Sequence, residues 1–165
     1  MSDILLFQRI TELKRTKSEL ERKLNVQINL NGKTVKIKGD SLDEYEASLV
    51  LDAINFGFSA KRALLLKEES KIFRILNIKR FTKKRDLKTV RARIIGKKGK
   101  TKETIENITG ADLVIRDNEI GIIASADTIE DIVTAIIALI RGTKQSNTYH
   151  YLEKLLVAKL SESAV

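Results

Sequence analysis

The spacing of apolar residues in the second half of this chain alternates between that of helices and that of strands. Residues 101–109 carry apolar side chains at helical spacing, and residues 111–117 and 119–125 read as two strands around a turn at Asn118. A second helical pattern then runs to Gly142, with apolar residues at Ile129, Ile132, Val133, Ile136 and Ile140. The pattern predicts a helix, two paired strands and a long helix.

The first half of the chain repeats this order, about 85 residues earlier. Residues 17–24 read as a helix, and residues 26–31 and 34–39 read as strands around Asn31-Gly32, a strong hairpin signal. Ser41 and Glu44 have the spacing of a capping box, which predicts that the long helix begins there. Two copies of one unit indicate an internal duplication.

Further elements frame the two copies. Residues 4–7 and 71–78 read as opening strands, residues 59–67 as a linking helix and residues 149–160 as a terminal helix. We therefore expect an α+β protein with two similar domains, each a three-stranded sheet packed against helices. The predicted boundaries are 1–57 for the first domain, 58–70 for the link and 71–165 for the second.

A glycine-bounded loop, Gly96-Lys97-Lys98-Gly99, separates two helical segments of the second copy. Glycine has no Cβ, so a polymer backbone can approach it closely, and it takes positive φ without steric cost. The lysines add positive charge, and the following helix presents unpaired N–H groups at its start. Such a loop suits a sugar-phosphate backbone, and KH modules clamp about four nucleotides of RNA with a GXXG loop.

Charge is concentrated around this loop. The chain has 31 basic and 22 acidic residues, a net charge of +9, and between Lys79 and Lys102 twelve Lys or Arg stand against the single acid Asp86. A run of charge is often only a solvated surface. Around a glycine-bounded loop, it favours a polyanionic ligand.

The candidate RNA-binding residues cluster in this part of the second copy. Glycines 96 and 99 would admit the RNA backbone, and nearby cations would pair with phosphates. Four apolar residues would form a groove floor for bases, although plain core packing explains them equally well. The full set is Arg91, Arg93, Ile94, Ile95, Gly96, Lys97, Lys98, Gly99, Lys100, Thr101, Lys102, Ile105 and Leu113.

The first copy lacks this loop. The matching residues are Thr11-Glu12-Leu13-Lys14, which contain no glycine and include an acid. We expect the first domain to keep the fold without the phosphate grip. Protein contact, orientation of the second domain, or RNA binding through another face are its remaining roles.

Composition argues against catalysis and against bound cofactors. The chain has no cysteine and one histidine, which leaves no thiolate metal site and little for acid–base chemistry. Gly96–Thr101 ends like a Walker A loop, but it has two residues between its glycines instead of four. We expect no enzyme, no metal and no cofactor. No apolar run is long enough for a membrane span, so we expect a soluble, cytoplasmic protein.

Three stretches together resemble the archaeal partner-of-Nob-one (Dim-two) family of KH proteins, which act in ribosome assembly. They are Arg91–Thr101, Ile105–Gly110 and Thr148–Glu153, and the linker Gly57–Leu64 is also similar to the family's, with Ala60 in place of a proline. The resemblance implies two tandem type I KH domains without catalytic activity. Archaeal relatives often keep GXXG in the first domain, and this chain departs from them there.

The resemblance also implies a function and partners. It implies binding of single-stranded RNA at or near the 3′ end of small-subunit rRNA or its precursor. The implied partners are the Nob-one endonuclease and other assembly or initiation factors. Two alternatives remain open: a general KH adaptor for the exosome or for messages, and a protein scaffold.

Overall fold

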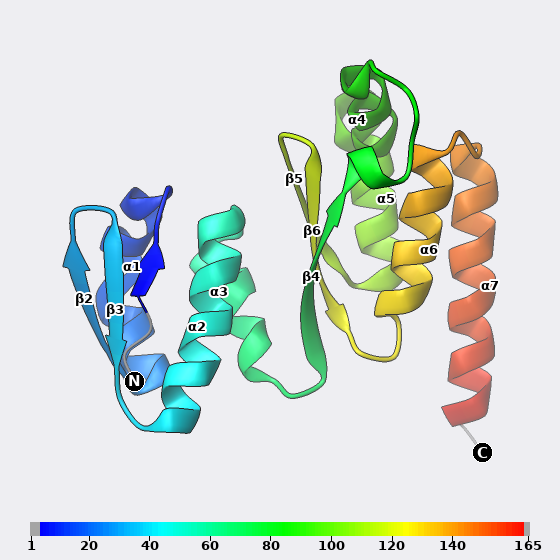
Figure 1. Cartoon of the computed structure of the whole chain (residues 1–165). Coiled ribbons are helices and arrows are strands. Elements are labelled where there is room, and N and C mark those ends of the chain that lie inside the picture. The colour runs from blue at the N-terminus through cyan, green and yellow to red at the C-terminus, as the bar shows by residue number, and fades with distance from the viewer. Residues whose placement is uncertain (1–3, 164–165) are drawn as a thin grey trace. The chain divides into compact units, whose positions relative to one another are not determined.

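The computed structural model describes residues 4–163, and it divides the chain into two compact units between Phe73 and Arg74 (Figure 1). Each unit holds its own three-stranded sheet and its own buried core. The predicted α+β fold with a duplicated unit is confirmed. No helix of the described residues is long and apolar enough to cross a membrane.

The first unit builds an antiparallel sheet in the order β1-β3-β2 and covers it with helices. Its elements are β1 (Ile4–Leu6), α1 (Ile10–Leu24), β2 (Gln27–Asn31), β3 (Thr34–Lys38), α2 (Ser41–Phe56), α3 (Ala60–Ala63) and the 3₁₀ helix η1 (Leu64–Lys67). The predicted link therefore consists of α3 and η1, and both pack against α2 inside this unit.

Alternation of buried and exposed residues explains the first sheet. Ile28, Val35 and Ile37 are at most 1% exposed and face the helices, while their strand neighbours face solvent. Gly32 has φ +60 in the turn between β2 and β3, a conformation that glycine adopts without strain. The hairpin predicted from Asn31-Gly32 is therefore present.

The second unit has the sheet order β4-β6-β5. Its elements are β4 (Lys71–Asn77), the 3₁₀ helix η2 (Ile78–Arg80), α4 (Leu87–Ile95), the 3₁₀ turn η3 (Lys97–Gly99), α5 (Lys100–Thr109), β5 (Asp112–Arg116), β6 (Glu119–Ser125), α6 (Ile129–Ile140) and α7 (Gln145–Ser163). The terminal helix α7 packs against α5 and α6 (Figure 1). It begins at Gln145, four residues before the predicted start.

The end of one helix matches between the two units. Asn25 ends α1 with φ +55, and Gly110 ends α5 with φ +72, both in the left-handed region. Glycine and asparagine reach this region at the lowest cost. The sequence alignment of the two copies is therefore correct at this point.

The start of α1 differs from the prediction. The helix begins at Ile10, not at residue 17, so Thr11-Glu12-Leu13-Lys14 form its first turns instead of a loop. These four residues contain no helix breaker, and Leu13 is fully buried on the same side as Leu20. One continuous helix thus stands where the second unit has α4, a loop and α5.

The predicted capping box at the start of α2 is also shifted. Asp40 is the N-cap residue, and Ser41 is already helical. The side chain of Glu44 accepts a hydrogen bond from the backbone N–H of Gly39 at 3.0 Å. The carboxylate still satisfies a backbone donor at the helix start, but one residue earlier than the box requires.

Candidate nucleic-acid interface

The loop between α4 and α5 has three residues in the left-handed region. Gly96 has φ +77, Lys98 has φ +54 and Gly99 has φ +76. Glycine tolerates this region, whereas a lysine there is strained. The two glycines and the strained lysine together reverse the chain within one 3₁₀ turn and deliver it directly into α5.

The two glycines serve different purposes. A Cβ at Gly96 would lie 2.2 Å from the Oγ1 of Thr101 and 2.6 Å from its backbone nitrogen. A Cβ at Gly99 would meet nothing within 4 Å. Gly96 therefore lets the loop close against the start of α5, and Gly99 presents bare backbone to solvent.

Three lysines surround the open side of the loop. Lys97, Lys98 and Lys100 are exposed, and among the described residues no carboxylate lies within 4 Å of their ammonium groups. The first N–H groups of α5 start beside them, where the helix dipole favours an anion. This part of the surface combines positive charge with close access to the main chain.

The other predicted cations are engaged within the unit. Arg91 donates to the carbonyl of Asp117 at 3.0 Å, and Arg93 donates to the carbonyl of Leu139 at 3.4 Å. Lys102 pairs with Glu106 at 2.9 Å. These side chains brace the site, and a ligand would have to share or replace their contacts.

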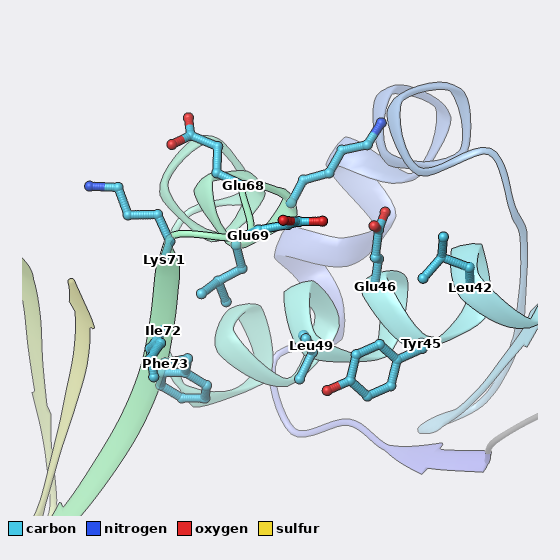
Figure 2. Close-up of a pocket in the computed structure, with 11 residues that line it drawn as sticks. Leu42, Tyr45, Glu46, Leu49, Glu68, Glu69, Lys71, Ile72 and Phe73 are labelled. Atoms are coloured by element: carbon cyan, nitrogen blue, oxygen red, sulfur yellow. The ribbon is translucent and has the colours of Figure 1, made fainter. Parts of the chain in front are cut away.

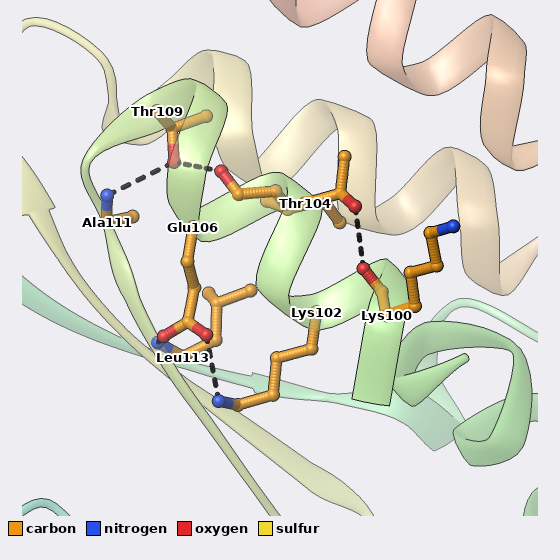
Figure 3. A network of polar contacts seen from close by, with 8 residues as sticks. Lys100, Lys102, Thr104, Glu106, Thr109, Ala111 and Leu113 are labelled. Carbon is orange, nitrogen blue, oxygen red and sulfur yellow. Dashed lines mark hydrogen bonds and ion pairs between the residues drawn. The ribbon is translucent and has the colours of Figure 1, made fainter. Parts of the chain in front are cut away.

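Figure 3 shows how the polar contacts of α5 hold it to β5. One oxygen of Glu106 accepts from Lys102, and the other accepts from the backbone N–H of Leu113 at 3.1 Å. At the end of the helix, the hydroxyl of Thr109 accepts from the N–H of Ala111 at 3.1 Å. The network fixes α5, and with it the loop, relative to the neighbouring strand.

The four apolar candidates lie at two depths. Ile94 and Ile105 have no exposed surface and Leu113 is 2% exposed, so these side chains pack in the core beneath the loop. Ile95 is 37% exposed and is the one of the four that offers apolar surface to a ligand. Thr101, beside Gly96, is 5% exposed.

The corresponding region of the first unit has a different use. Glu12 accepts a hydrogen bond from Arg15 at 2.7 Å and a long one, 3.4 Å, from the backbone N–H of Ala60 at the start of α3. The hydrogen bond from Arg15 is the main cause that lowers the pKa of Glu12 below its ordinary value. A carboxylate thus anchors α3 where the second unit presents lysines.

The first unit, which extends to Phe73 and so includes the first three residues of β4, also has a cavity of about 440 Å³ between α2, η1 and these residues (Figure 2). Leu42, Leu49 and Ile72 give it apolar walls. Its charged lining residues are three acids and two bases: Glu46, Glu68, Glu69, Lys67 and Lys71. Carboxylates repel phosphate, so this cavity is a poor place for a nucleic-acid backbone. The loop of the second unit remains the candidate interface.

Comparison with known proteins agrees with this geometry. Residues 72–156 match the family model for the second domain of the PNO1 proteins, described as a eukaryotic type KH-domain (KH-domain type I). The fold and the loop therefore define a type I KH protein. The chain belongs to the PNO1/Dim2 family of KH proteins.

Two solved structures are similar over nearly their whole length. The crystal structure of Dim2p from Pyrococcus horikoshii has a TM-score of 0.84 and 31% identity, covering 93% of this chain and 99% of that one. The a/eIF2alpha–aDim2p–rRNA complex from the same organism has a TM-score of 0.83 and 31% identity, covering 93% of both chains.

Curated relatives are longer than this chain. A KH domain-containing protein of Methanocaldococcus jannaschii is 28% identical over 84% of this chain and 64% of its own length. The RNA-binding protein PNO1 of Oryzias latipes is 33% identical over 76% of this chain and 55% of its own length. The chain thus spans between half and two thirds of these relatives.

Proposed function

We propose that the second unit binds single-stranded RNA and grips its sugar-phosphate backbone with the Gly96–Gly99 loop. The observation that carries the proposal is the open main chain at Gly99, flanked by three lysines that have no acidic partner among the described residues. Phosphates would pair with Lys97, Lys98 and Lys100, beside the start of α5, where the helix dipole favours an anion. Ile95 would contact a base.

The RNA we propose is the small-subunit rRNA or its precursor, at or near the 3′ end. Relatives of this chain include the pre-rRNA-processing protein PNO1 of Debaryomyces hansenii, and a structural neighbour forms a complex with rRNA. The protein would assist maturation of the small ribosomal subunit in the cytoplasm. It would act by binding, without a catalytic step or cofactor of its own.

We propose assembly and initiation factors as protein partners. The structural neighbour aDim2p forms its complex with a/eIF2alpha as well as rRNA, which supports a partner of this kind. A Nob-one-type endonuclease is the further partner that the family suggests. The first unit, which lacks the loop, is the part of the chain left for protein contact.

The test of the RNA proposal is the double substitution Lys97→Asp and Lys98→Asp. Aspartate tolerates the left-handed backbone at position 98 better than lysine does, so the fold should persist. We expect at least a tenfold loss of affinity for single-stranded RNA, roughly 1.4 kcal/mol or more. Affinity can be measured by fluorescence anisotropy and folding by circular dichroism.

A matched control replaces Lys33 and Lys38 of the first unit with aspartate. Both are exposed lysines in the loop-free unit, and the change in net charge is the same. Unchanged RNA affinity of the Lys97/Lys98 variant would refute the proposed grip.

Crosslinking in cells would identify the RNA target. Reads spread over messages, and not gathered at the rRNA 3′ end, would favour a general adaptor.

A further inference from the structure

A second basic surface lies in the second unit between β4 and α4. Six of the ten residues from 79 to 88 are basic and all six are exposed, namely Lys79, Arg80, Lys83, Lys84, Arg85 and Lys88. We call this segment the 79–88 segment. It includes η2 and the connection that follows it, drawn in green between β4 and α4 in Figure 1.

The single acid of the segment, Asp86, offsets only a small part of this positive charge. Asp86 caps α4: its carboxylate accepts from the hydroxyl of Thr89 at 2.5 Å and from the backbone N–H of Thr89 at 3.4 Å. The Thr89 hydroxyl is the main cause that lowers the pKa of Asp86 below its ordinary value. The carboxylate is therefore occupied by the start of the helix.

Elsewhere in the same unit, cations do have acidic partners. Arg74 pairs with Glu130, Lys102 with Glu106 and Lys159 with Asp131. Among the described residues, no such ion pair involves the six cations of the 79–88 segment. Like charges so close together repel each other, and a polyanion relieves that repulsion.

Three hydrogen bonds anchor the start and the middle of the 79–88 segment. The N–H of Ile78 donates to the carbonyl of Asn118 at 2.8 Å, and the side chain of Asn77 accepts from the N–H of Lys79 at 3.0 Å. The hydroxyl of Thr82 accepts from the N–H of Lys84 at 3.2 Å. These contacts order the backbone that carries Lys79 and Lys84, which lowers the entropy cost of binding a ligand there.

A row of exposed residues on α4 joins the segment to the GXXG loop. Lys88, Ala92 and Ile95 are exposed and lie at positions i, i+4 and i+7, which share one face of a helix. None of these three residues is acidic, and the central one, Ala92, has a side chain too small to block an RNA strand. Seven residues of helix span about 10 Å, a distance that a few nucleotides can cover.

We infer that the 79–88 segment is a second phosphate-binding surface, which extends the RNA footprint along α4 beyond the nucleotides held by the GXXG loop. The inference rests on the proposed RNA-binding function. The inference adds that the protein should bind long single strands more tightly than short ones. The extra contacts are to phosphate, so they add affinity without reading bases.

The test compares nested RNAs from the small-subunit rRNA 3′ end, of about four and about ten nucleotides. The variant is Lys83→Gln, Lys84→Gln, Arg85→Gln in the full chain. These side chains are exposed and make no hydrogen bond or ion pair in the described structure, so the fold should be unaffected. The control variant, Arg141→Gln, Lys144→Gln, Lys154→Gln, removes the same charge from exposed positions elsewhere in the unit.

We expect the 83–85 variant to bind the longer RNA about tenfold or more weakly and the shorter one nearly as well as the parent. The slope of log affinity against log salt for the longer RNA should fall by about two, because three phosphate contacts are lost. Equal losses in the two triple variants, or no loss in either, would overturn the inference.

The two proposals fail separately. If the Lys97/Lys98 variant loses both RNAs while the 83–85 variant loses neither, the loop binds RNA and the second surface does not. If the Lys97/Lys98 variant keeps both RNAs, the proposed grip itself is wrong.

Discussion

The two glycines of the loop between α4 and α5 have different roles, one in folding and one in binding. Gly96 sits against Thr101, and Gly99 faces open space. The GXXG motif contains both glycines without distinguishing them, so their different roles can be seen only in the structure. It allows stability and RNA affinity to be changed separately.

Gly96→Ala should destabilise the second unit by about 2–5 kcal/mol, because its Cβ collides with Thr101 at a residue of positive φ. Gly99→Ala meets no neighbour and should cost only about 1–2 kcal/mol, from the left-handed backbone alone. Urea denaturation would measure both free energies of unfolding.

RNA affinity should separate the two variants further. The added methyl of Gly99→Ala occupies the space through which a phosphate would approach. We therefore expect Gly99→Ala to weaken RNA binding although most of the stability is kept. Equal destabilisation by the two alanines would contradict the different roles assigned to these glycines.

Among whole elements, helix and strand identity could be predicted well from the sequence. Hairpin glycines, alternating apolar residues and left-handed helix ends are local signals, and Asn25, Gly110 and Gly32 all behave as their residue types favour. The tandem order of elements therefore followed from short-range patterns. The same patterns set the family resemblance, which the comparisons confirm.

Two features were not predicted, the first because a local signal was overlooked. The early start of α1 was missed because the repeat suggested a loop at Thr11–Lys14, although Leu13, Leu20 and Leu24 are spaced along one helix face. The burial of Ile94 and Ile105 was left open because GXXG spacing does not fix the depth of its neighbours. Only the second depends on packing against elements distant in sequence.

Restoring the motif in α1 should not restore RNA binding. Replacing Thr11-Glu12-Leu13-Lys14 with Gly-Lys-Lys-Gly removes the fully buried Leu13 and puts two glycines into a helix. The loss of Leu13 alone should cost about 2–5 kcal/mol, and each glycine up to about 1 kcal/mol more.

The same variant in the Lys97→Asp/Lys98→Asp background tests binding directly. We expect thermal denaturation to show a destabilised first unit and anisotropy to show no regained RNA affinity. Recovery of affinity would mean that the helix opens into a functional loop once the motif is present.

At the scale of the molecule, each unit has its own core, so its stability should depend mainly on its own side chains. Leu20→Ala removes a fully buried side chain from the first unit and should cost it about 2–5 kcal/mol. Hydrogen exchange should speed up in β2 and β3 and stay nearly unchanged in β5 and β6.

RNA affinity of the Leu20→Ala protein should stay within about twofold of the parent, since that corresponds to only a few tenths of a kcal/mol. Its matched control is Ile136→Ala in α6, a fully buried residue of the second unit. That change should accelerate exchange in β5 and β6 and weaken RNA binding. A strong loss of affinity in Leu20→Ala would show that the two cores are coupled.

The carboxylate of Glu12, which holds the start of α3, also bears on how this protein can evolve. To turn these residues into a GXXG loop, mutations would have to break the Glu12 anchor, remove the buried side chain of Leu13 and insert two glycines. RNA affinity could be gained only after all of these changes. Each step alone lowers stability. Single mutations toward a GXXG loop in α1 are therefore disfavoured, because stability falls before any affinity for RNA can be gained.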